Sequence, residues 1–515
     1  MTTLIVHGHF YQPPRENPWT GEIDTEPGAA PFHDWNERIQ AECYGPNTHV
    51  VLGVPEAGAS VMVDNYSKIS FNFGPTLLSW LERKHADTYT AILDADRASI
   101  AQRNGHGNAI AQGYNHAILP LCNQRDLRTQ IRWGVADFRH RFGRLPESLW
   151  LPETACNAQV LDALIDEGLR FAILEPHQAA RVRPSSESEW HDVTDGNVDT
   201  SIAYRYTHRD GSSRSIALFF YDGPISRAVA FDGLLRSSRN LVDRFEHGRS
   251  GMGNMLNIAT DGETYGHHFK FGDVCLAHAL EAEAPGRGFT ITNYGDYLDQ
   301  HPPEWEIEIN NGPDGEGTSW SCVHGVGRWI RDCGCQTGGD LGWNQSWRGP
   351  LRKALDFLRD ENAESFDATR GFLFIDPWQA RDDSVELILD QTREREQFLW
   401  EHAGRWLSGE EQRRALTLLE IQRMTLLMYT SCGWFFNDIS GIETLQILKY
   451  AARAIDLMDQ VGLPPVRSRF LEMLAEAESN RPALGNGADI YRQFIEPLQP
   501  SSVIARDREG AEALA

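Results

Sequence analysis

Short apolar runs that end in polar residues alternate along the first 300 residues with segments of helical periodicity. The runs TLIVHGHF (3–10), LRFAILE (169–175) and GNMLNIATDGETYG (253–266) have the length and apolar content of buried strands. Between them, DLRTQIRWGVADFRHRFG (126–143) and AQVLDALIDEG (158–168) have the spacing of amphipathic helices. This alternation predicts an α/β fold, with residues 1–300 forming a parallel barrel with long loops.

Polar residues repeatedly follow the predicted strands. In parallel α/β barrels the carboxyl ends of the strands carry the functional site, because all of those ends meet at one face. We therefore expect one candidate site to draw on the following strand-end residues: His7, His9, Asn115, His116, Glu153, Asp222, Asp261 and Glu263.

The pattern changes after the predicted barrel. Residues 301–349 are rich in Gly, Trp and Cys and have little periodicity, which predicts an irregular connecting segment lining the cleft. Residues 350–483 are helical in pattern and predict a C-terminal helical bundle, and 484–515 is expected to be a partly disordered tail. Within the bundle, TLQILKYAARAIDLM places four apolar residues on one helical face: Leu445, Leu448, Ala452 and Ile455.

Composition and charge narrow the classes of function. The 515-residue chain is 41% hydrophobic and 23% charged, as is ordinary for globular proteins. Its formal net charge of -25 argues against binding to nucleic acid or to anionic membranes, both of which need Lys and Arg. No run approaches the ~18 apolar residues of a spanning helix, and MTTLIVHGHFYQPP lacks the basic start of a secretory signal. Eight thinly spread Cys residues suit a reducing compartment, so we expect a cytoplasmic protein.

Three stretches, in this order, resemble motifs of glycoside hydrolase family 57. HGHFYQPP resembles its opening His-containing strand, WLPETA the motif with the catalytic nucleophile, and TDGETYGHH the motif whose Asp is the general acid/base. The segments SCVHGVGRWIRDCGCQTGG and SCGWFFNDISGIETLQILKYA resemble a subgroup with a Cys-, Trp- and Gly-rich segment after the barrel. The resemblance implies an incomplete (β/α)7 barrel with a C-terminal α-helical domain, retention of anomeric configuration, α-glucans as common substrates and no cofactor.

The resemblance assigns the two carboxyl groups that a retaining glycosidase needs, which lie about 5–5.5 Å apart in such enzymes. It implies that Glu153 is the nucleophile and Asp261 the general acid/base. An ionised Glu153 close by would raise the pKa of Asp261 and keep it protonated until the proton is needed. The alternative interpretations are a helix-start carboxylate for Glu153 and a turn-forming aspartate before Gly262 for Asp261.

Further polar residues are candidates for substrate binding. His7 and His9 share one face of their strand, and Glu263 shares a face with Asp261 if that segment is extended. The two histidines are alternatively hydrogen-bonded core residues, and Glu263 is alternatively the acid itself. Asp222 precedes Gly223, so the alternative to a site role is that Asp222 forms a turn. The candidate polar substrate-binding residues are His7, His9, Gln12, His116, Asp222, Glu263 and His267.

Aromatic and cysteine residues in the C-terminal half add two more candidates. Trp320, Trp343 and Trp434 have faces suited to sugar rings, and the alternative for each is a buried tryptophan of the core. Residues 322–335 contain the pattern C-x-H-x8-C-x-C, formed by Cys322, His324, Cys333 and Cys335. These are enough ligands for tetrahedral zinc, but the spacing is not that of a standard zinc knuckle. Free packed thiols are favoured over a metal or a disulfide, so no metal site is predicted.

The leading functional hypothesis is a retaining glycosidase or transglycosylase that acts on an α-linked glucan or oligosaccharide by a two-carboxylate double displacement. Hydrolysis and transfer both stay open, because the loops that decide between them have no readable pattern. A second hypothesis is a metal-dependent carbohydrate hydrolase or deacetylase on a related barrel, with His7, His9 and Asp261 as ligands. A third is a glycan-binding protein without catalysis.

Overall fold

The structure is a computed structural model, and it describes residues 2–54, 59–248 and 251–500. The chain divides into two compact units. The first, the sheet unit, comprises Met1–Gln12, Thr25–Tyr114 and Asp137–Ser321. The second, the helical unit, comprises Pro13–Asp24, Asn115–Ala136 and Cys322–Ala515. The units interleave along the chain, which differs from the contiguous division into 1–300, 301–349 and 350–483 expected from the sequence.

The sheet unit contains a succession of parallel strands. β1 pairs with β12 and with β4, β5 pairs with β6, and β7 pairs with β11, all in parallel. Isolated parallel bridges join Phe71 to Ala109 and Ser148 to Phe171, which continues the succession from β4 to β5 and from β6 to β7. The strands in spatial order are β12 (Met255–Asp261), β1 (Thr2–Phe10), β4 (Ser70–Phe73), β5 (Ala111–Gln112), β6 (Leu149–Trp150), β7 (Phe171–Leu174) and β11 (Ser215–Phe220).

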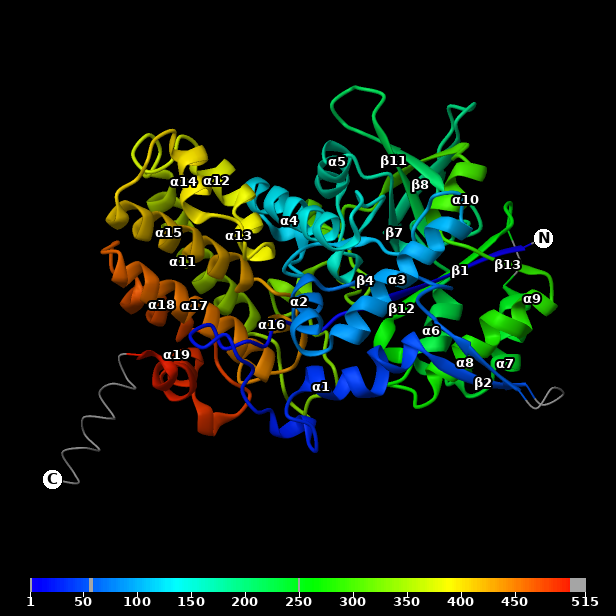
Figure 1. Cartoon of the computed structure of the whole chain (residues 1–515), viewed down its shortest axis with the longest axis horizontal. Helices are drawn as coiled ribbons and strands as arrows, with labels where there is room; N and C mark the ends of the chain where they lie inside the picture. Colours follow the sequence, from blue (N-terminus) through cyan, green and yellow to red (C-terminus); the bar gives the residue numbers. More distant parts are fainter. Residues whose placement is uncertain (1, 55–58, 249–250, 501–515) are drawn as a thin grey trace. The chain divides into compact units, whose positions relative to one another are not determined.

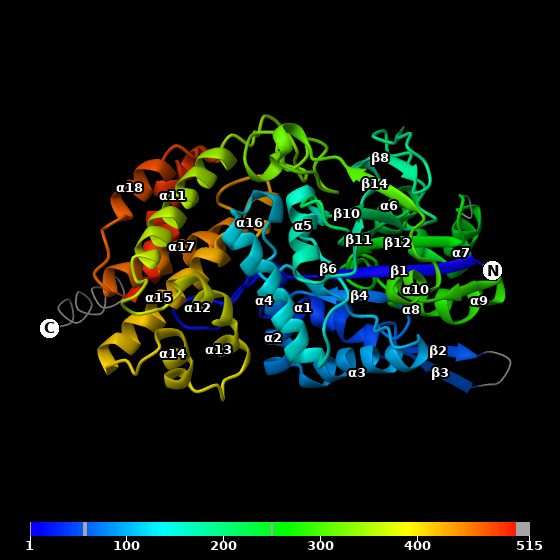
Figure 2. The ribbon, with the colours of Figure 1, turned by 90° about the horizontal axis from the view of Figure 1, so that it is seen from above.

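Continuous apolar runs form these strands because both faces of a parallel sheet are covered. Leu4, Ile5 and Val6 of β1 are 0% exposed. Ile5 belongs to one apolar core with Trp150 of β6 and Phe219 of β11. The order β12–β1–β4 can be followed in Figures 1 and 2, where β1 is the dark blue strand that begins at the N-terminus.

Several segments expected to be irregular contain strands. Residues 181–215, which are largely polar, contribute strands to a sheet with the order β7-β11-β10-β14-β8-β9. The residues before about 65, outside β1, contain an antiparallel pair, β2 with β3. The irregular segment expected from residue 301 begins with a strand, β14. These remaining strands are β2 (Val50–Val54), β3 (Ala59–Val63), β8 (Ala179–Pro184), β9 (His191–Asp192), β10 (Tyr204–Thr207), β13 (Phe289–Ile291), which pairs with β1, and β14 (Trp305–Ile309).

Helices connect the strands of the sheet unit, as the alternating pattern predicted. The helix expected at 126–143 is α4 (Gln124–Phe142), which begins in a piece of the helical unit and ends in the sheet unit. The helix expected at 158–168 is α5 (Ala158–Asp166), whose N-cap Asn157 accepts from the Val160 N–H. The others are α1 (Trp35–Ile39), α2 (Pro75–Lys84), α3 (Ala86–Gln102), α6 (Gly223–Phe231), α7 (Ser238–His247), α8 (Gly272–His278), α9 (Ala284–Gly286) and α10 (Tyr294–Gln300).

The helical unit is built around long amphipathic helices. In Figures 1 and 2, α11 lies beside α15 and α18, and α15 lies beside α17. Leu448, Ala452 and Ile455 of α17 are 0% exposed, which agrees with the predicted apolar face. The helices are α11 (Arg348–Asp367), α12 (Pro377–Asp383), α13 (Val385–Leu389), α14 (Arg395–Ala403), α15 (Gly409–Leu427), α16 (Cys432–Phe435), α17 (Ile442–Gln460), α18 (Arg467–Leu474) and α19 (Gly487–Ile490). Across the described residues, no helix combines the length and the apolar character needed to cross a membrane.

The expected partly disordered tail needs correction for its first part. Residues 487–498 form α19 and two further helical turns, and Ile490, Tyr491 and Ile495 are 0% exposed. Buried apolar side chains hold this stretch in the helical unit, so residues 487–498 are ordered. Residues 501–515 lie outside the described residues.

Candidate active site

Three strand ends bring the sequence motifs together in the sheet unit. The register of β1 places His9 opposite Asp261 of β12 on one side and opposite Asn72 of β4 on the other. Glu153 lies three residues after the end of β6, in the short helical turn η5 (Pro152–Thr154). The residues therefore gather at the carboxyl ends of parallel strands, as the polar strand-end pattern predicted.

The backbone at Glu153 is held in an uncommon conformation. Its φ angle is +59° and that of Thr154 is +49°, in the left-handed region that β-branched residues such as Thr rarely occupy. The Trp320 N–H donates to the Glu153 carbonyl oxygen (3.1 Å) and to Thr154 Oγ1 (3.1 Å). The hydrogen bonds from the Trp320 N–H thus hold Glu153 and Thr154 in a strained turn. Such strain is common at functional sites.

The carboxylate of Glu153 is oriented by two side-chain donors. Glu153 Oε2 accepts from Trp320 Nε1 (3.0 Å) and from Ser321 Oγ (2.7 Å). Hydrogen bonds to a carboxylate stabilise its negative charge and restrict its rotation. Trp320 was a candidate as a sugar platform, and the structure gives its indole N–H this second role. Ser321 was missed, and its position beside Trp320 is the one signal the sequence offered.

Asp261 is accessible to solvent yet enclosed by protein atoms at the end of β12. Desolvation and, second, the negative charge of Glu153 raise the pKa of Asp261 to about 7. A carboxyl group with this pKa exchanges its proton near neutral pH, so it can both donate and accept a proton during a reaction. The charge effect also shows that the two carboxyl groups, from motifs more than 100 residues apart, interact electrostatically.

His7 and His9 are buried and hydrogen-bonded, in agreement with their core interpretation. His7 is 0% exposed and contacts Ser70 Oγ (3.0 Å) and Asn72 Oδ1 (3.1 Å). His9 Nδ1 contacts the side chain of Asn72. Burial lowers the pKa of each histidine to about 3, and for His9 the proximity of His7 adds to this, so both imidazoles are neutral. A neutral imidazole places a hydrogen-bonding nitrogen at the strand end without adding charge.

Trp150 forms the aromatic floor beneath these histidines, and the sequence analysis missed it. Its ring stacks on His7 with a centroid distance of 4.8 Å and on His9 at 5.0 Å, and meets Trp320 edge-on at 5.2 Å. Trp150 lies in the same SLWLPETA stretch as Glu153, two residues before Pro152. Because Trp150 ends β6, the ring that stacks on the histidines lies directly before the turn that carries Glu153.

Glu263 has a different position from Asp261. It is 5% exposed, and its Oε1 accepts from Tyr44 Oη (2.6 Å) and from the Tyr11 N–H (3.0 Å). Desolvation first, and to a lesser extent the charge of Asp261, raise the pKa of Glu263 to about 8. Its bonded oxygen ties the end of β1 to Tyr44, so in this structure Glu263 supports the site and is not exposed as a proton donor.

Three other candidates form hydrogen bonds to residues of the sheet unit. Asp222 caps α6 by accepting from the Ile225 N–H (2.8 Å), which is the turn-forming role rather than an open site role. His267 Nδ1 pairs with the Glu42 carboxylate. Gln12 Nε2 donates to the Tyr11 carbonyl oxygen (3.1 Å).

The remaining candidates belong to the helical unit, where each has its own contacts. His116 is 1% exposed and its Nδ1 contacts Ser431 Oγ (2.6 Å). Trp434 is 1% exposed and its Nε1 donates to the Arg348 carbonyl oxygen (3.3 Å), so its face is not available to a ligand. The buried-core alternative is therefore the correct one for Trp434. Trp343 is half-buried, with the Arg481 guanidinium 5.6 Å from its ring.

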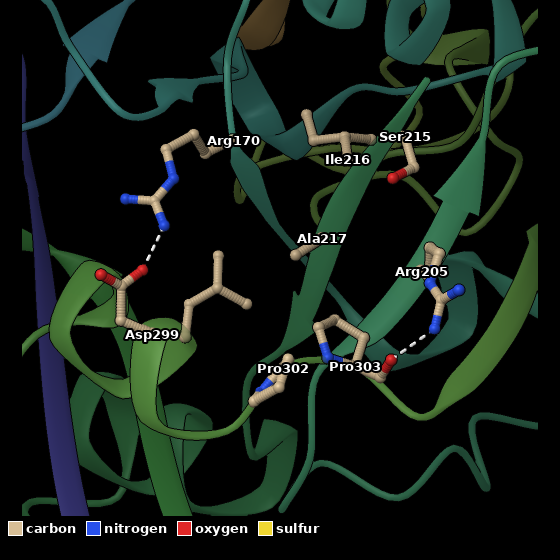
Figure 3. Close-up of a pocket in the computed structure, with 9 residues that line it drawn as sticks. Arg170, Arg205, Ser215, Ile216, Ala217, Asp299, Pro302 and Pro303 are labelled. Carbon is tan, nitrogen blue, oxygen red and sulfur yellow. Dashed lines mark hydrogen bonds and ion pairs between the residues drawn. The ribbon is translucent and has the colours of Figure 1, made fainter. Parts of the chain in front are cut away.

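A separate surface pocket of about 330 Å³ lies at the opposite ends of the strands. It is lined by Arg170, which precedes β7, and by Ser215 to Ala217 at the start of β11 (Figure 3). In Figure 3, Arg170 reaches Asp299, and Arg205 reaches the Pro303 carbonyl oxygen at 2.6 Å. Both guanidinium groups are engaged by these partners.

Comparisons with known proteins agree with this geometry. The structure is similar to an exo-type maltose-forming amylase from Pyrococcus sp. ST04 (TM-score 0.67, 14% identity, 98% of this chain and 94% of that chain). It is also similar to a branching enzyme from Pyrococcus horikoshii (0.54, 14%, 96% and 96%) and to a 4-alpha-glucanotransferase from Thermococcus litoralis (0.51, 14%, 89% and 60%). At these identities the likeness establishes the fold alone. No curated protein matches the chain in sequence.

Two family models match the sequence itself. Residues 343–505 match a domain of unknown function, DUF3536. Residues 4–310, more than half of the chain, match glycosyl hydrolase family 57, and this range contains all three motifs and both candidate carboxyl groups. The family resemblance read from the sequence is thereby confirmed: the chain belongs to glycosyl hydrolase family 57.

Proposed function

We propose that the protein is a retaining glycoside hydrolase or transglycosylase that acts on an α-linked glucan or oligosaccharide, with Glu153 as nucleophile and Asp261 as general acid/base. The observation that carries the proposal is the coupling between the two carboxyl groups: Glu153 lies close enough for its charge to raise the pKa of Asp261, which burial and this charge bring to about 7. Glycosidases use a pair of carboxyl groups with different pKa values, one ionised and one protonated, as their catalytic residues.

The chemistry divides into two displacements. In the first, the Glu153 carboxylate attacks the anomeric carbon while Asp261 gives its proton to the departing glycosidic oxygen, which forms a glycosyl ester and a free sugar hydroxyl. In the second, Asp261 takes a proton from water or from an acceptor hydroxyl, which attacks the anomeric carbon and releases Glu153. Two inversions give net retention of configuration.

The donors around Glu153 have a role in this sequence. Trp320 Nε1 and Ser321 Oγ both bind Oε2 and hold the carboxylate in one orientation. An oriented nucleophile lowers the entropic cost of attack. The same two donors stabilise the carboxylate when it leaves in the second displacement.

We also infer that the parallel strands form an incomplete (β/α)7 barrel. The succession from β12 through β1, β4, β5, β6 and β7 to β11 supports this inference, as does the joining of its ends through the Asp222 N–H, which donates to the Asn257 carbonyl oxygen (2.8 Å). Such a barrel gathers the strand ends into one site. An α-linked glucan as substrate is supported by the names of the solved structures with similar folds, which are an amylase, a branching enzyme and a glucanotransferase.

The test is incubation of wild type, Glu153→Gln and Asp261→Asn with a panel of α-linked oligosaccharides and polysaccharides. Each substitution keeps the shape of the side chain and removes its ionisable oxygen, so we expect turnover to fall at least about 10³-fold in both variants. NMR of the first product should show the anomeric configuration of the substrate. New reducing ends without longer chains indicate hydrolysis, and rearranged chains without new reducing ends indicate transfer.

Asp162→Asn serves as the matched control, because Asp162 is a carboxylate of α5 that pairs with Arg209 at 2.7 Å. It should turn over substrate like wild type. Inversion of configuration, or full activity in either catalytic variant, contradicts the assignment.

A further inference from the structure

Four potential metal ligands converge in the helical unit. Cys322, His324, Cys333 and Cys335 each offer one ligand atom, and all four atoms lie within 4.8 Å of one another. The Cys322 sulfur is 3.9 Å from that of Cys333 and 3.7 Å from that of Cys335, and the Cys335 sulfur is 3.5 Å from His324 Nδ1. In the described part of the chain, this is the one group of three or more His, Cys, Asp and Glu residues with such an arrangement.

These three separations are close to the edge lengths of a zinc tetrahedron, and the four ligand atoms all lie within 4.8 Å of one another. With Zn–S bonds of about 2.3 Å and Zn–N bonds of about 2.0–2.1 Å, tetrahedral geometry puts sulfurs about 3.8 Å apart and sulfur and nitrogen about 3.5 Å apart. A disulfide would join two of the thiols and leave the third thiol and the imidazole facing it. Thiols packed at random have no reason to surround a common centre together with an imidazole nitrogen.

The backbone around the cluster is shaped to bring the ligands together. Gly325 and Gly334 have φ angles of +75° and +78°, so tight turns follow His324 and separate Cys333 from Cys335. A Cβ atom at Gly327 would lie 3.1 Å from the Cys333 Cβ, so a side chain at residue 327 would crowd the two arms of the loop.

The charge next to the cluster fits three thiolates. Arg348 is 0% exposed, and its Nη1 lies 3.9 Å from the Cys333 sulfur and donates to the Cys335 carbonyl oxygen at 3.0 Å. Its Nη2 donates to the carbonyl oxygens of Phe435 and Phe436, which are uncharged, and a buried guanidinium needs a compensating negative charge. Zn²⁺ bound by three thiolates and a neutral imidazole carries a net charge of about −1, which offsets that of Arg348.

We propose that Cys322, His324, Cys333 and Cys335 bind one structural Zn²⁺ ion. A donor set of three sulfurs and one nitrogen favours zinc among the common divalent metals, and four protein ligands leave no position for substrate. The ion fixes a stretch in which residues 330–347 contain no helix or strand. Along the chain, the first zinc ligand, Cys322, directly follows Ser321, which donates to Glu153. The proposal differs from the interpretation as free packed thiols, which the sequence spacing of the four residues favoured.

The test is metal analysis of the full-length protein purified without chelator and under reducing conditions. We expect about one zinc per chain by mass spectrometry of the metal content. Cobalt added to the metal-free protein should give the absorption of tetrahedral Co²⁺ with thiolate charge transfer, and zinc should displace it. Cys333→Ser and His324→Ala should each lose stoichiometric zinc.

Cys122→Ser is the matched control, because Cys122 also lies in the helical unit and its thiol donates to the Ile118 carbonyl oxygen (3.7 Å), a bond that serine can make. It should keep its zinc. The wild-type measurements do not depend on whether a variant folds. Reduced wild type that binds neither zinc nor cobalt overturns the proposal, as does a disulfide within the cluster in the freshly purified protein. One equivalent of iron in place of zinc overturns the choice of metal.

Discussion

At the scale of single residues, Asp261 and Glu263 show how environment separates two carboxyl groups with one residue between them. Desolvation by surrounding protein atoms raises the pKa of both, but the Asp261 side chain is exposed to solvent whereas Glu263 is buried and bonded to Tyr44 and Tyr11. Accessibility therefore distinguishes a group that can exchange protons with a substrate from one that supports the chain. The spacing DGE alone does not make this distinction.

The pKa of Asp261 predicts the pH dependence of catalysis. In the proposed mechanism Asp261 must be protonated to donate to the leaving oxygen, and its raised pKa of about 7 means that the active form is present below this pH and is lost above it. We expect kcat/KM to fall about tenfold per pH unit above about pH 7. A profile that stays flat to about pH 9 contradicts the role of Asp261. Circular dichroism over the same range provides the control for unfolding.

At the scale of elements, the site depends on how turns follow strands. β12 ends at Asp261, and the turn η8 (Gly262–Thr264) begins at once against the side chain of Phe10 from β1. Phe10 is 0% exposed and stacks on Phe73 of β4 with a centroid distance of 4.8 Å. The aromatic packing beneath the strand ends thus fixes where the Asp261 carboxyl group lies.

Gly262→Ala tests this coupling between packing and site. The new Cβ would lie 2.3 Å from Phe10 Cδ1, so the turn or the ring must move. Overpacking of this kind costs about 1–3 kcal/mol, and we expect a lower unfolding midpoint together with reduced kcat, because Asp261 is the preceding residue. Gly286→Ala, where a Cβ meets nothing within 4 Å, should change neither. Wild-type stability and activity in Gly262→Ala would show that η8 does not position the carboxyl group.

At the scale of the whole molecule, each of the two compact units is built from separate segments of the chain. Pieces from the first 136 residues belong to the helical unit. There, Trp19 Nε1 donates to Asp456 (2.9 Å), and Trp133 Nε1 donates to the Asp382 carbonyl oxygen (2.9 Å). Arg381 pairs with Asp126 at 2.7 Å in a buried position. The matched family region is therefore not separable from the rest of the chain by a single cut.

A chain truncated after Ser321 is expected to fold poorly. It keeps the three motifs but lacks Asp456, Asp382 and Arg381, which are the polar partners of Trp19, Trp133 and Asp126. Removing one member of a buried ion pair alone costs about 3–5 kcal/mol. We expect aggregation on size-exclusion chromatography and loss of near-UV circular dichroism, relative to the full-length chain prepared in parallel. A monomeric, active fragment 1–321 would disprove this dependence.

Local pattern accounts for the features that the sequence predicted. Apolar runs of strand length, helical periodicity and polar strand ends are determined within about ten residues, so β1, β7, β12, α4 and α5 were all expected near their observed bounds. Glu153 and Asp261 were found because each sits in a motif at the end of such a run. The β2–β3 pair and β14 were missed because their stability comes from pairing partners, which local pattern does not reveal.

The sequence by itself thus determined the family and the strand-and-helix alternation and identified the two candidate carboxyl groups, because these follow from short-range order. Only the tertiary structure decided what surrounds them: Trp320 and Ser321 approach Glu153 across more than 160 residues of chain, Trp150 stacks under the histidines, and the Cys322 sulfur meets those of Cys333 and Cys335. The physical reason is that hydrogen bonds, pKa shifts and ligand geometry depend on distances of a few ångströms between residues far apart in sequence. Those distances are set by packing, and no local pattern encodes them.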